Sequence, residues 1–276
     1  MNRHLLVASM MILSSSAFAA DPVSMAPAEP AAVRNACSGH VEAYLGGVLP
    51  VVDGDSDDSM LAYGGSARAN CTFHQNWNVQ GDLFGDRVED GDDSVSMYGA
   101  AGHLFWRDPS SFAVGIFATV SRASQLGTDF DQYTFGPEFQ AYLGNVTLYG
   151  QAEYGQLTIG DLPLDFDVWS VRGVVRYFAK ENLRFDAELA YRDREGTLFP
   201  FPNTFTAALQ ANYRFDDTPY TIFGRYQYDQ AETEFYEIDT HKLSAGLRVS
   251  FGAKTLLEED RYGATMDTLR TNSPAF

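Results

Sequence analysis

Charged residues recur at alternate positions along several segments of this sequence, a spacing that places them on one face of a β-strand. Eight are basic and form what we call the basic set: Arg172, Arg176, Arg184, Arg192, Arg214, Arg225, Lys242 and Arg248. Four come earlier in the chain and form the acidic set: Glu42, Asp82, Glu138 and Glu153. If both sets faced one enclosed space, a basic wall opposite an acidic wall would orient a dipolar or anionic solute in water. The alternative is that cross-strand ion pairs between such residues merely fill that space.

The two cysteines have the separation of residues that face each other in a hairpin. In a hairpin centred on Gly54, Cys37 lies opposite Cys71, and Val41 lies opposite Ala67. Cysteines of exported proteins usually pair. We therefore expect a disulfide that staples the first hairpin and has no catalytic role.

The other candidates for metal binding or catalysis fail on spacing. The acidic run at 53–58 resembles the start of a calcium loop, but Asp58 and Gly64 stand where that loop needs glycine and glutamate. No G-x-S-x-G motif or His/Cys/Glu metal spacing occurs. His103 shares the face of the charged residues, and the strand serine nearest to His241 lies on the opposite face. The sequence predicts no metal site, no cofactor and no enzyme; a lipid-modifying enzyme is kept only as a third hypothesis.

The elements that carry the charges are clearest at 166–192, where two alternating segments are joined by a tight turn. In the first segment Trp169, Val171 and Tyr177 share one face, while Arg172 and Arg176 share the other. Aromatic residues at both ends of an apolar face, with small aliphatic residues between them, are typical of a lipid-facing strand. The hairpin therefore predicts part of a membrane-spanning sheet with its charges turned to an interior.

Residues 1–20 have the three parts of a secretory signal peptide: a basic start, an apolar run at 5–13 and a small-x-small site at 17–19. No other run approaches the roughly 20 apolar residues of a spanning helix. An exported membrane protein of this kind must close a sheet, because lipid cannot satisfy an open strand edge. The net charge of −18 argues against a nucleic-acid partner.

About twelve alternating segments follow the signal peptide, between residues 38 and 252. Connections after even-numbered segments are tight, and those after odd-numbered segments are generally longer and acidic, as at 53–58 and 123–131. This asymmetry is typical of outer-membrane barrels. We expect residues 21–37 to be a periplasmic linker and residues 253–276 to be a charged periplasmic tail.

The last segment has apolar residues at alternate positions and ends on phenylalanine: Leu243, Ala245, Leu247, Val249 and Phe251. In this the chain resembles bacterial outer-membrane β-barrel proteins of the porin-like type, whose closing strand carries such a pattern as an assembly signal. It departs from that family by continuing after Phe251. The signal is therefore expected at Phe251 and not at the end of the chain.

Pattern and resemblance together predict an all-β fold, a transmembrane antiparallel β-barrel of about 12 strands at residues 38–252. The resemblance implies the bacterial outer membrane as location. Its implied partners are outer-membrane lipid and lipopolysaccharide, the outer-membrane assembly machinery and small solutes. Two functions stay open. One is a porin-like channel for passive diffusion of small hydrophilic solutes, anions among them; the alternative is a filled structural or surface-interaction barrel without transport activity.

Overall fold

The structure is a computed structural model that describes residues 37–52, 55–56, 58–91, 93–160, 165–195, 202–232 and 237–268. The predicted signal peptide at 1–20 lies outside the described residues. So does the predicted linker at 21–37, apart from Cys37.

The described residues form strands and one short helix. In chain order these are β1 (Cys37–Val52), β2 (Asp55–Ser56), β3 (Met60–His74), β4 (Trp77–Asp90), β5 (Asp93–Asp108), β6 (Phe112–Gln125), β7 (Thr128–Leu143), β8 (Val146–Ile159), β9 (Asp165–Lys180), β10 (Leu183–Glu195), β11 (Asn203–Arg214), β12 (Tyr220–Glu232), β13 (Glu237–Phe251) and α1 (Leu256–Tyr262). β2 is two residues long and only extends the pairing of β1. The barrel itself therefore has twelve strands.

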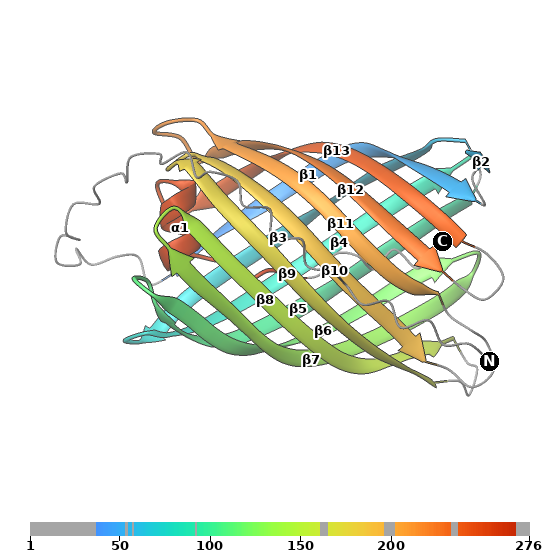
Figure 1. The fold of residues 1–276 in the computed structure, drawn as a ribbon, viewed down its shortest axis with the longest axis horizontal. Coiled ribbons are helices and arrows are strands. Elements are labelled where there is room, and N and C mark those ends of the chain that lie inside the picture. Colours follow the sequence, from blue (N-terminus) through green and yellow to red (C-terminus); the bar gives the residue numbers. More distant parts are fainter. Residues whose placement is uncertain are drawn as a thin grey trace, which may run out of the picture. The chain divides into compact units, whose positions relative to one another are not determined.

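Each long strand pairs antiparallel with the next, and the sheet closes because β13 also pairs with β1. The closing register runs from Gly39 opposite Phe251 to Val52 opposite Ile238. Figure 1 shows the strands tilted around a common axis. This closed antiparallel barrel confirms the predicted fold class and the predicted number of strands. None of the helical residues in the described ranges forms a segment long and apolar enough to span a bilayer.

Burial alternates along the strands as the period-two pattern predicts. In β9, Trp169, Val171 and Val175 are exposed on the outer face, whereas Arg172 and Arg176 are buried in the interior. Exposed aliphatic and aromatic side chains occupy the outer face of the other long strands too. The outer face of β13 carries all the residues of the proposed assembly signal: Leu243, Ala245, Leu247, Val249 and Phe251. A sheet with an apolar outside and a polar inside meets lipid and not bulk water.

The first hairpin has the register that the cysteine spacing predicts. Cys37 faces Cys71 and Val41 faces Ala67, and the two cysteines form a disulfide. The bond lies at the end of the barrel where the short turns are, as at 75–76 and 144–145.

The connections at the opposite end are less uniformly long than the sequence suggested. The long loop predicted at 123–131 is wrong: Leu126 and Gly127 form a two-residue turn, both with positive φ as in a type I′ hairpin. The polar residues expected in a loop instead extend the ladder, because Arg122 pairs with Asp131 across the strands at 2.6 Å. The charged residues Arg122 and Asp131 therefore belong to the ends of paired strands and not to a loop.

If the outer face of the sheet contacts lipid, a charge on that face in the middle of β11 should be destabilising. Leu209, which is exposed on the outer face, should lose stability by about 2–4 kcal/mol when replaced by arginine, because the charge would enter hydrocarbon. Reversible guanidinium unfolding in lipid vesicles measures this. Gln210→Arg on the neighbouring inward position is the matched control and should cost much less. Equal costs at both positions would contradict the assignment of faces.

Candidate functional site

Every member of the basic and acidic sets points into the barrel. Most are buried, and Arg225 and Lys242 keep about a quarter of their side chains exposed to the interior space. The alternation that hides them from lipid follows from the strand pleat, since each has apolar neighbours one position away on the outer face.

The two sets do not form separate walls, because strand residues of opposite charge are paired throughout the interior. Arg248 lies 2.8 Å from Glu42, Arg192 lies 3.2 Å from Glu153, and Lys242 lies 2.8 Å from Asp229. Arg172 and Arg225 share Glu188, and Arg184 pairs with Asp186. The predicted transverse field between opposed walls is thus replaced by local neutralisation. Local pairing is possible because the inward acids of β10 and β12, Asp186, Glu188 and Asp229, lie among the cations of β9 to β13.

The acidic set also contains residues that serve neighbours outside the basic set. Asp82 accepts a hydrogen bond from Arg68 at 2.9 Å, and Glu138 lies 3.0 Å from the His103 ring nitrogen. His103 is buried against these two acids and stacks on Phe117. Within the described ranges, no group of three or more His, Cys, Asp and Glu side chains is arranged to hold a metal ion.

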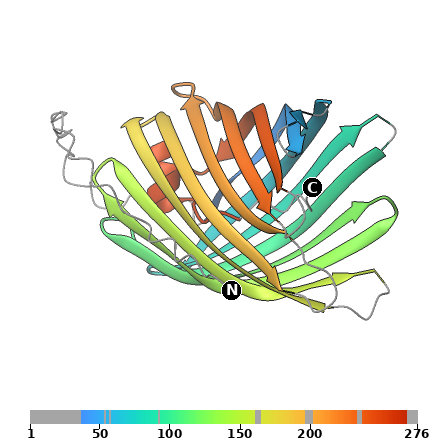
Figure 2. The same cartoon turned by 45° about the vertical axis from the view of Figure 1, so that its right-hand side comes forward.

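The largest departure from the predicted arrangement is the C-terminal segment. Residues 253–276 were expected as a periplasmic tail, but the part that the structure describes, 253–268, lies inside the barrel; we call it the inserted segment. Figure 2 shows α1 on the inner side of the curved sheet. After Phe251 the chain reverses at Gly252, whose φ is +81°. A Cβ there would lie 2.6 Å from the Ser38 side chain, so glycine is required by both conformation and space.

α1 is a single helix of two turns held at both ends. The Thr255 side chain accepts a hydrogen bond from the Glu258 amide, which is the usual N-cap arrangement. The Leu257 amide donates to the Glu181 carbonyl in the β9–β10 turn, and Arg261 donates to the Gly144 carbonyl in the β7–β8 turn. The helix is thereby fixed at the end of the barrel where the short turns lie.

The acids of α1 meet arginines of the barrel wall. Glu259 pairs with Arg214 and lies 3.0 Å from His40 and 3.8 Å from Arg248. Burial opposes the charged form of Glu259, but His40 and the two arginines outweigh it and hold the pKa of Glu259 well below its ordinary value. The inserted segment thus supplies a counter-charge that the strands lack.

Asp260 repeats this arrangement one residue further along α1. It accepts a hydrogen bond from Arg176 at 2.8 Å and one from Thr147 at 2.6 Å, and it also pairs with Arg261. Burial would raise the pKa of Asp260, but Arg176 and Arg261 lower it below the ordinary value. Asp260 is therefore charged inside the barrel at neutral pH.

Residues 263–268 continue into the barrel without regular secondary structure. The Gln80 side chain forms two hydrogen bonds with the backbone of Met266, at 2.8 and 3.2 Å. Gln140 and Arg176 donate to the Thr265 carbonyl, and Arg107 donates to the Gly263 carbonyl at 2.8 Å. Met266 itself packs with Phe105, Tyr142, Tyr149 and other buried residues of an interior cluster. The segment fills the barrel at this level.

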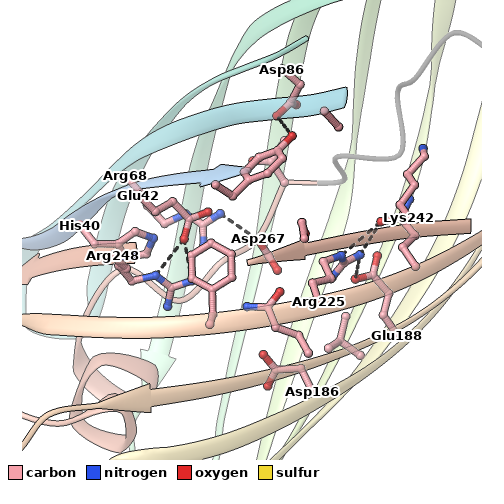
Figure 3. A pocket seen from close by; sticks show the side chains of 18 of the residues that line it. His40, Glu42, Arg68, Asp86, Asp186, Glu188, Arg225, Lys242, Arg248 and Asp267 are labelled. Atoms are coloured by element: carbon pink, nitrogen blue, oxygen red, sulfur yellow. Dashed lines mark hydrogen bonds and ion pairs between the residues drawn. The ribbon is translucent and has the colours of Figure 1, made fainter. Parts of the chain in front are cut away.

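A cavity of about 170 Å³ remains beside the inserted segment; we call it the vestibule. Ala264, Thr265, Asp267 and Thr268 form its floor. Val48, Val88 and Val95, which lie close to the loop ends of their strands, line the opposite part, so the vestibule extends toward the end away from α1. Figure 3 shows charged side chains from several strands turned into it, among them Arg225, Glu188 and Lys242.

Apolar side chains occupy one side of the interior near the loop end, which the sequence did not suggest. Phe84, Met97 and Ala123 pack with Phe130, and Leu157, Phe166 and Val168 form a neighbouring cluster. These residues lie on inward positions of β4 to β9, to which the sequence analysis assigned no role. Near the loop end the interior is therefore apolar along β4 to β9, whereas the same strands carry buried polar residues closer to α1.

The vestibule depends on the inserted segment for its charge balance. The residues that line it include seven arginines and lysines and seven aspartates and glutamates. Three of those acids, Glu259, Asp260 and Asp267, belong to the inserted segment. The strands alone provide seven cations and four acids, so the same space without the segment has a positive excess. Without the segment, the field of these lining residues would attract anions to the vestibule.

The composition of the tail indicates the insertion, but an analysis of strand alternation does not consider it. The tail combines acids at 258–260 and 267 with apolar residues such as Leu256 and Met266, both of which are fully buried. A tail in water needs no such apolar residues, and a barrel with an excess of inward arginines needs acids. A comparison of the acids in the tail with the excess of inward arginines would have predicted that the tail lies inside the barrel.

Comparisons with known proteins find this fold among solved structures. No protein-family model matches the chain, and no curated protein does either. An outer membrane channel from Pseudomonas putida F1 is similar in fold, with a TM-score of 0.57 and 11% identity over 82% of this chain and 100% of that chain. The β domain of the Bordetella autotransporter Brka has a TM-score of 0.51 and 11% identity over 78% of this chain and 100% of that chain. At these identities the similarity concerns the fold alone. The closed sheet and these two similarities show that the chain has the fold of bacterial outer-membrane β-barrels, and its apolar outer face is that of a sheet in contact with lipid.

Proposed function

We propose that this barrel is an outer-membrane channel for small hydrophilic solutes, and that the inserted segment is its closing element. The observation that carries the proposal is that acids of the inserted segment, and not of the strands, neutralise some of the wall arginines. Arg176 and Arg214 of the wall are paired with acids of a segment that is joined to the barrel at one end, next to Gly252. A pathway closed by such a segment opens when the segment leaves.

The contacts between the inserted segment and the wall are of a kind that water can replace, which supports a segment that can leave the barrel. Contacts of the segment with the wall include ion pairs and hydrogen bonds to Gln80, Arg107, Gln140 and Arg176. Each of these groups can bind water instead, and the net contribution of one hydrogen bond to stability is only about 0.5–1.5 kcal/mol. A permanent filling gains more from apolar packing than from buried ion pairs.

The second candidate function is the filled structural or surface-interaction barrel, and a specific observation favours it. Leu256 and Met266 are fully buried, and Met266 belongs to an interior apolar cluster. These contacts favour a tail that stays in place. The two candidates differ in one measurable property, which is whether ions cross the barrel when the segment is free to move.

The proposal includes the route by which the chain reaches the membrane. Residues 1–20 direct export, residues 21–37 link to the barrel, and the outward residues of β13 ending at Phe251 are recognised by the assembly machinery. Lipid and lipopolysaccharide contact the apolar outer face. No catalytic role is assigned to the chain.

A reversible tether tests the closing role of the segment. The side chains of Gln140 and Thr265 are 3.1 Å apart, one on β7 and one on the inserted segment. Cysteine is shorter than glutamine, so a cysteine pair at these positions needs a short spacer rather than a direct disulfide. The double variant Gln140→Cys/Thr265→Cys, once cross-linked by a short bis-methanethiosulfonate reagent, should show no current steps in a planar bilayer, and a reductant should restore steps like those of the unmodified protein.

The single variants Gln140→Cys and Thr265→Cys, treated with the same reagent, are the matched controls, since neither can form the cross-link. They and the unmodified protein show the effect of the reductant on the native Cys37–Cys71 bond. Steps of equal size before and after reduction would show that the segment does not close the pathway. Absence of current in every variant and at every voltage would favour the filled barrel.

Acidification should loosen the segment, because Glu259 and Asp260 have lowered pKa values when docked. A group of this kind stabilises docking at pH values above its free pKa, and the stabilisation is lost as the pH falls through the docked value. Docking should therefore be firm at pH 7 and weaken below about pH 4. Hydrogen exchange of peptides from 253–268, corrected for the intrinsic effect of pH, measures this. Peptides from β11 serve as the internal control, and protection of the segment that is unchanged down to pH 2 contradicts the prediction.

A further inference from the structure

Three arginines converge on one carboxylate of the inserted segment at the floor of the vestibule. Arg68 Nη2 donates to Asp267 Oδ1 at 2.8 Å, and Arg172 Nη2 donates to Asp267 Oδ2 at 3.1 Å. Arg176 Nη2 lies 3.8 Å from the same Oδ2. The three cations come from β3 and β9, so they approach the carboxylate from different sides. Figure 3 shows Asp267 between Arg68 and the vestibule residues.

The two nearest arginines are held in place by acids of the strands and not by Asp267. Arg68 donates through Nε to Asp82, and Arg172 donates through Nε to Glu188, each at 2.9 Å. Both guanidinium groups therefore keep their orientation and direct Nη2 to one point. Arg172 also lies over the Tyr149 ring, with its guanidinium carbon 5.7 Å from the ring centroid. A site fixed in this way loses little conformational freedom when a carboxylate binds.

The site has capacity beyond what Asp267 uses. Arg172 Nη1 is buried and has no hydrogen-bond partner among the described residues. A buried donor of this kind normally finds an acceptor, and its desolvation is costly when it does not. The Asp267 side chain is 28% exposed, whereas those of Glu259 and Asp260 are 5% and 0% exposed. Of these three acids, Asp267 has the easiest access from the vestibule.

We propose that this three-arginine site binds a carboxylate group of the solute that crosses the barrel, and that Asp267 occupies it as a tethered stand-in. The inference rests on the proposed channel function and names its solute class, which is small carboxylic acids. Arginine matches a carboxylate through two parallel N–H donors, which favours this planar group.

Competition for the site couples the solute to opening. A free carboxylate and Asp267 cannot both occupy the arginines, so binding of one weakens binding of the other. Loss of the Asp267 contact removes one anchor of the segment at its inner end. A carboxylate entering through the vestibule should therefore help the segment to leave, and a neutral solute should not.

A protease assay on the full chain tests the competition without measuring current. Arg261 is buried in α1, so trypsin should cleave after it only when the segment has left the barrel. Sodium glutarate should accelerate this cleavage on the order of tenfold, as expected for a typical coupling between two sites. Glutaramide, its uncharged diamide, should have no effect, and methyl phosphate should have less effect than glutarate.

Variants of the three-arginine site distinguish carboxylate binding there from a nonspecific weakening of the docking of the inserted segment. Asp267→Asn should be cleaved rapidly without glutarate and should no longer respond to it. Arg172→Lys keeps the positive charge but loses the two parallel N–H donors of the guanidinium group. This variant should need a higher glutarate concentration for the same acceleration of cleavage. Asp86→Asn is the matched control, because Asp86 lines the vestibule but accepts a hydrogen bond from Tyr44, outside the site. Its response to glutarate should equal that of the unmodified protein.

The possible failures are distinguishable. Equal acceleration by glutarate and glutaramide, or an unchanged response in Asp267→Asn, would overturn the carboxylate site, while current through the reduced tether variant would still support a channel. A stronger effect of methyl phosphate than of glutarate would also overturn the assignment to carboxylates. Glutarate-dependent cleavage in a protein that never conducts would retain the anion site and refute the channel.

Discussion

The structure depends on one constraint, which is that lipid offers no hydrogen-bond partner to a peptide group. Every backbone donor and acceptor within the bilayer must therefore be satisfied by a neighbouring strand, and the pairing of β13 with β1 completes the ring. Closure divides the side chains into two environments, because successive residues of a strand point to opposite faces. The apolar outer face and the charged interior of β9 are two results of the same pleat.

The interior must solve a second problem, which is how to bury many guanidinium groups. Strand acids neutralise part of them, as Glu188 does for Arg172 and Arg225. Others, among them Arg214 and Arg176, are neutralised by Glu259 and Asp260 of a segment that follows the last strand. Because a buried unpaired charge is strongly destabilising, the barrel and its C-terminal segment are electrostatically interdependent. The channel hypothesis depends on this interdependence being reversible.

The sequence predicted the barrel well because the strand pleat is a local property with a strict period. Trp169 and Arg172 could be assigned to opposite faces without knowledge of any contact, and the Cys37–Cys71 register followed from the hairpin alone. The inserted segment could not be found in this way. Contacts such as Arg68 with Asp267 join residues almost two hundred positions apart, and period-two reasoning carries no information about them. Ion pairing within the interior was likewise left as one of two alternatives.

The partners of the inserted segment are distributed around the whole ring of strands. They include Arg68 on β3, Gln80 on β4, Thr147 on β8 and Arg214 on β11. Only the complete ring presents all of these partners at once. The hold on the C-terminal segment is therefore a property of the closed sheet as a whole, so a substitution on any one of these strands can weaken it from a distance.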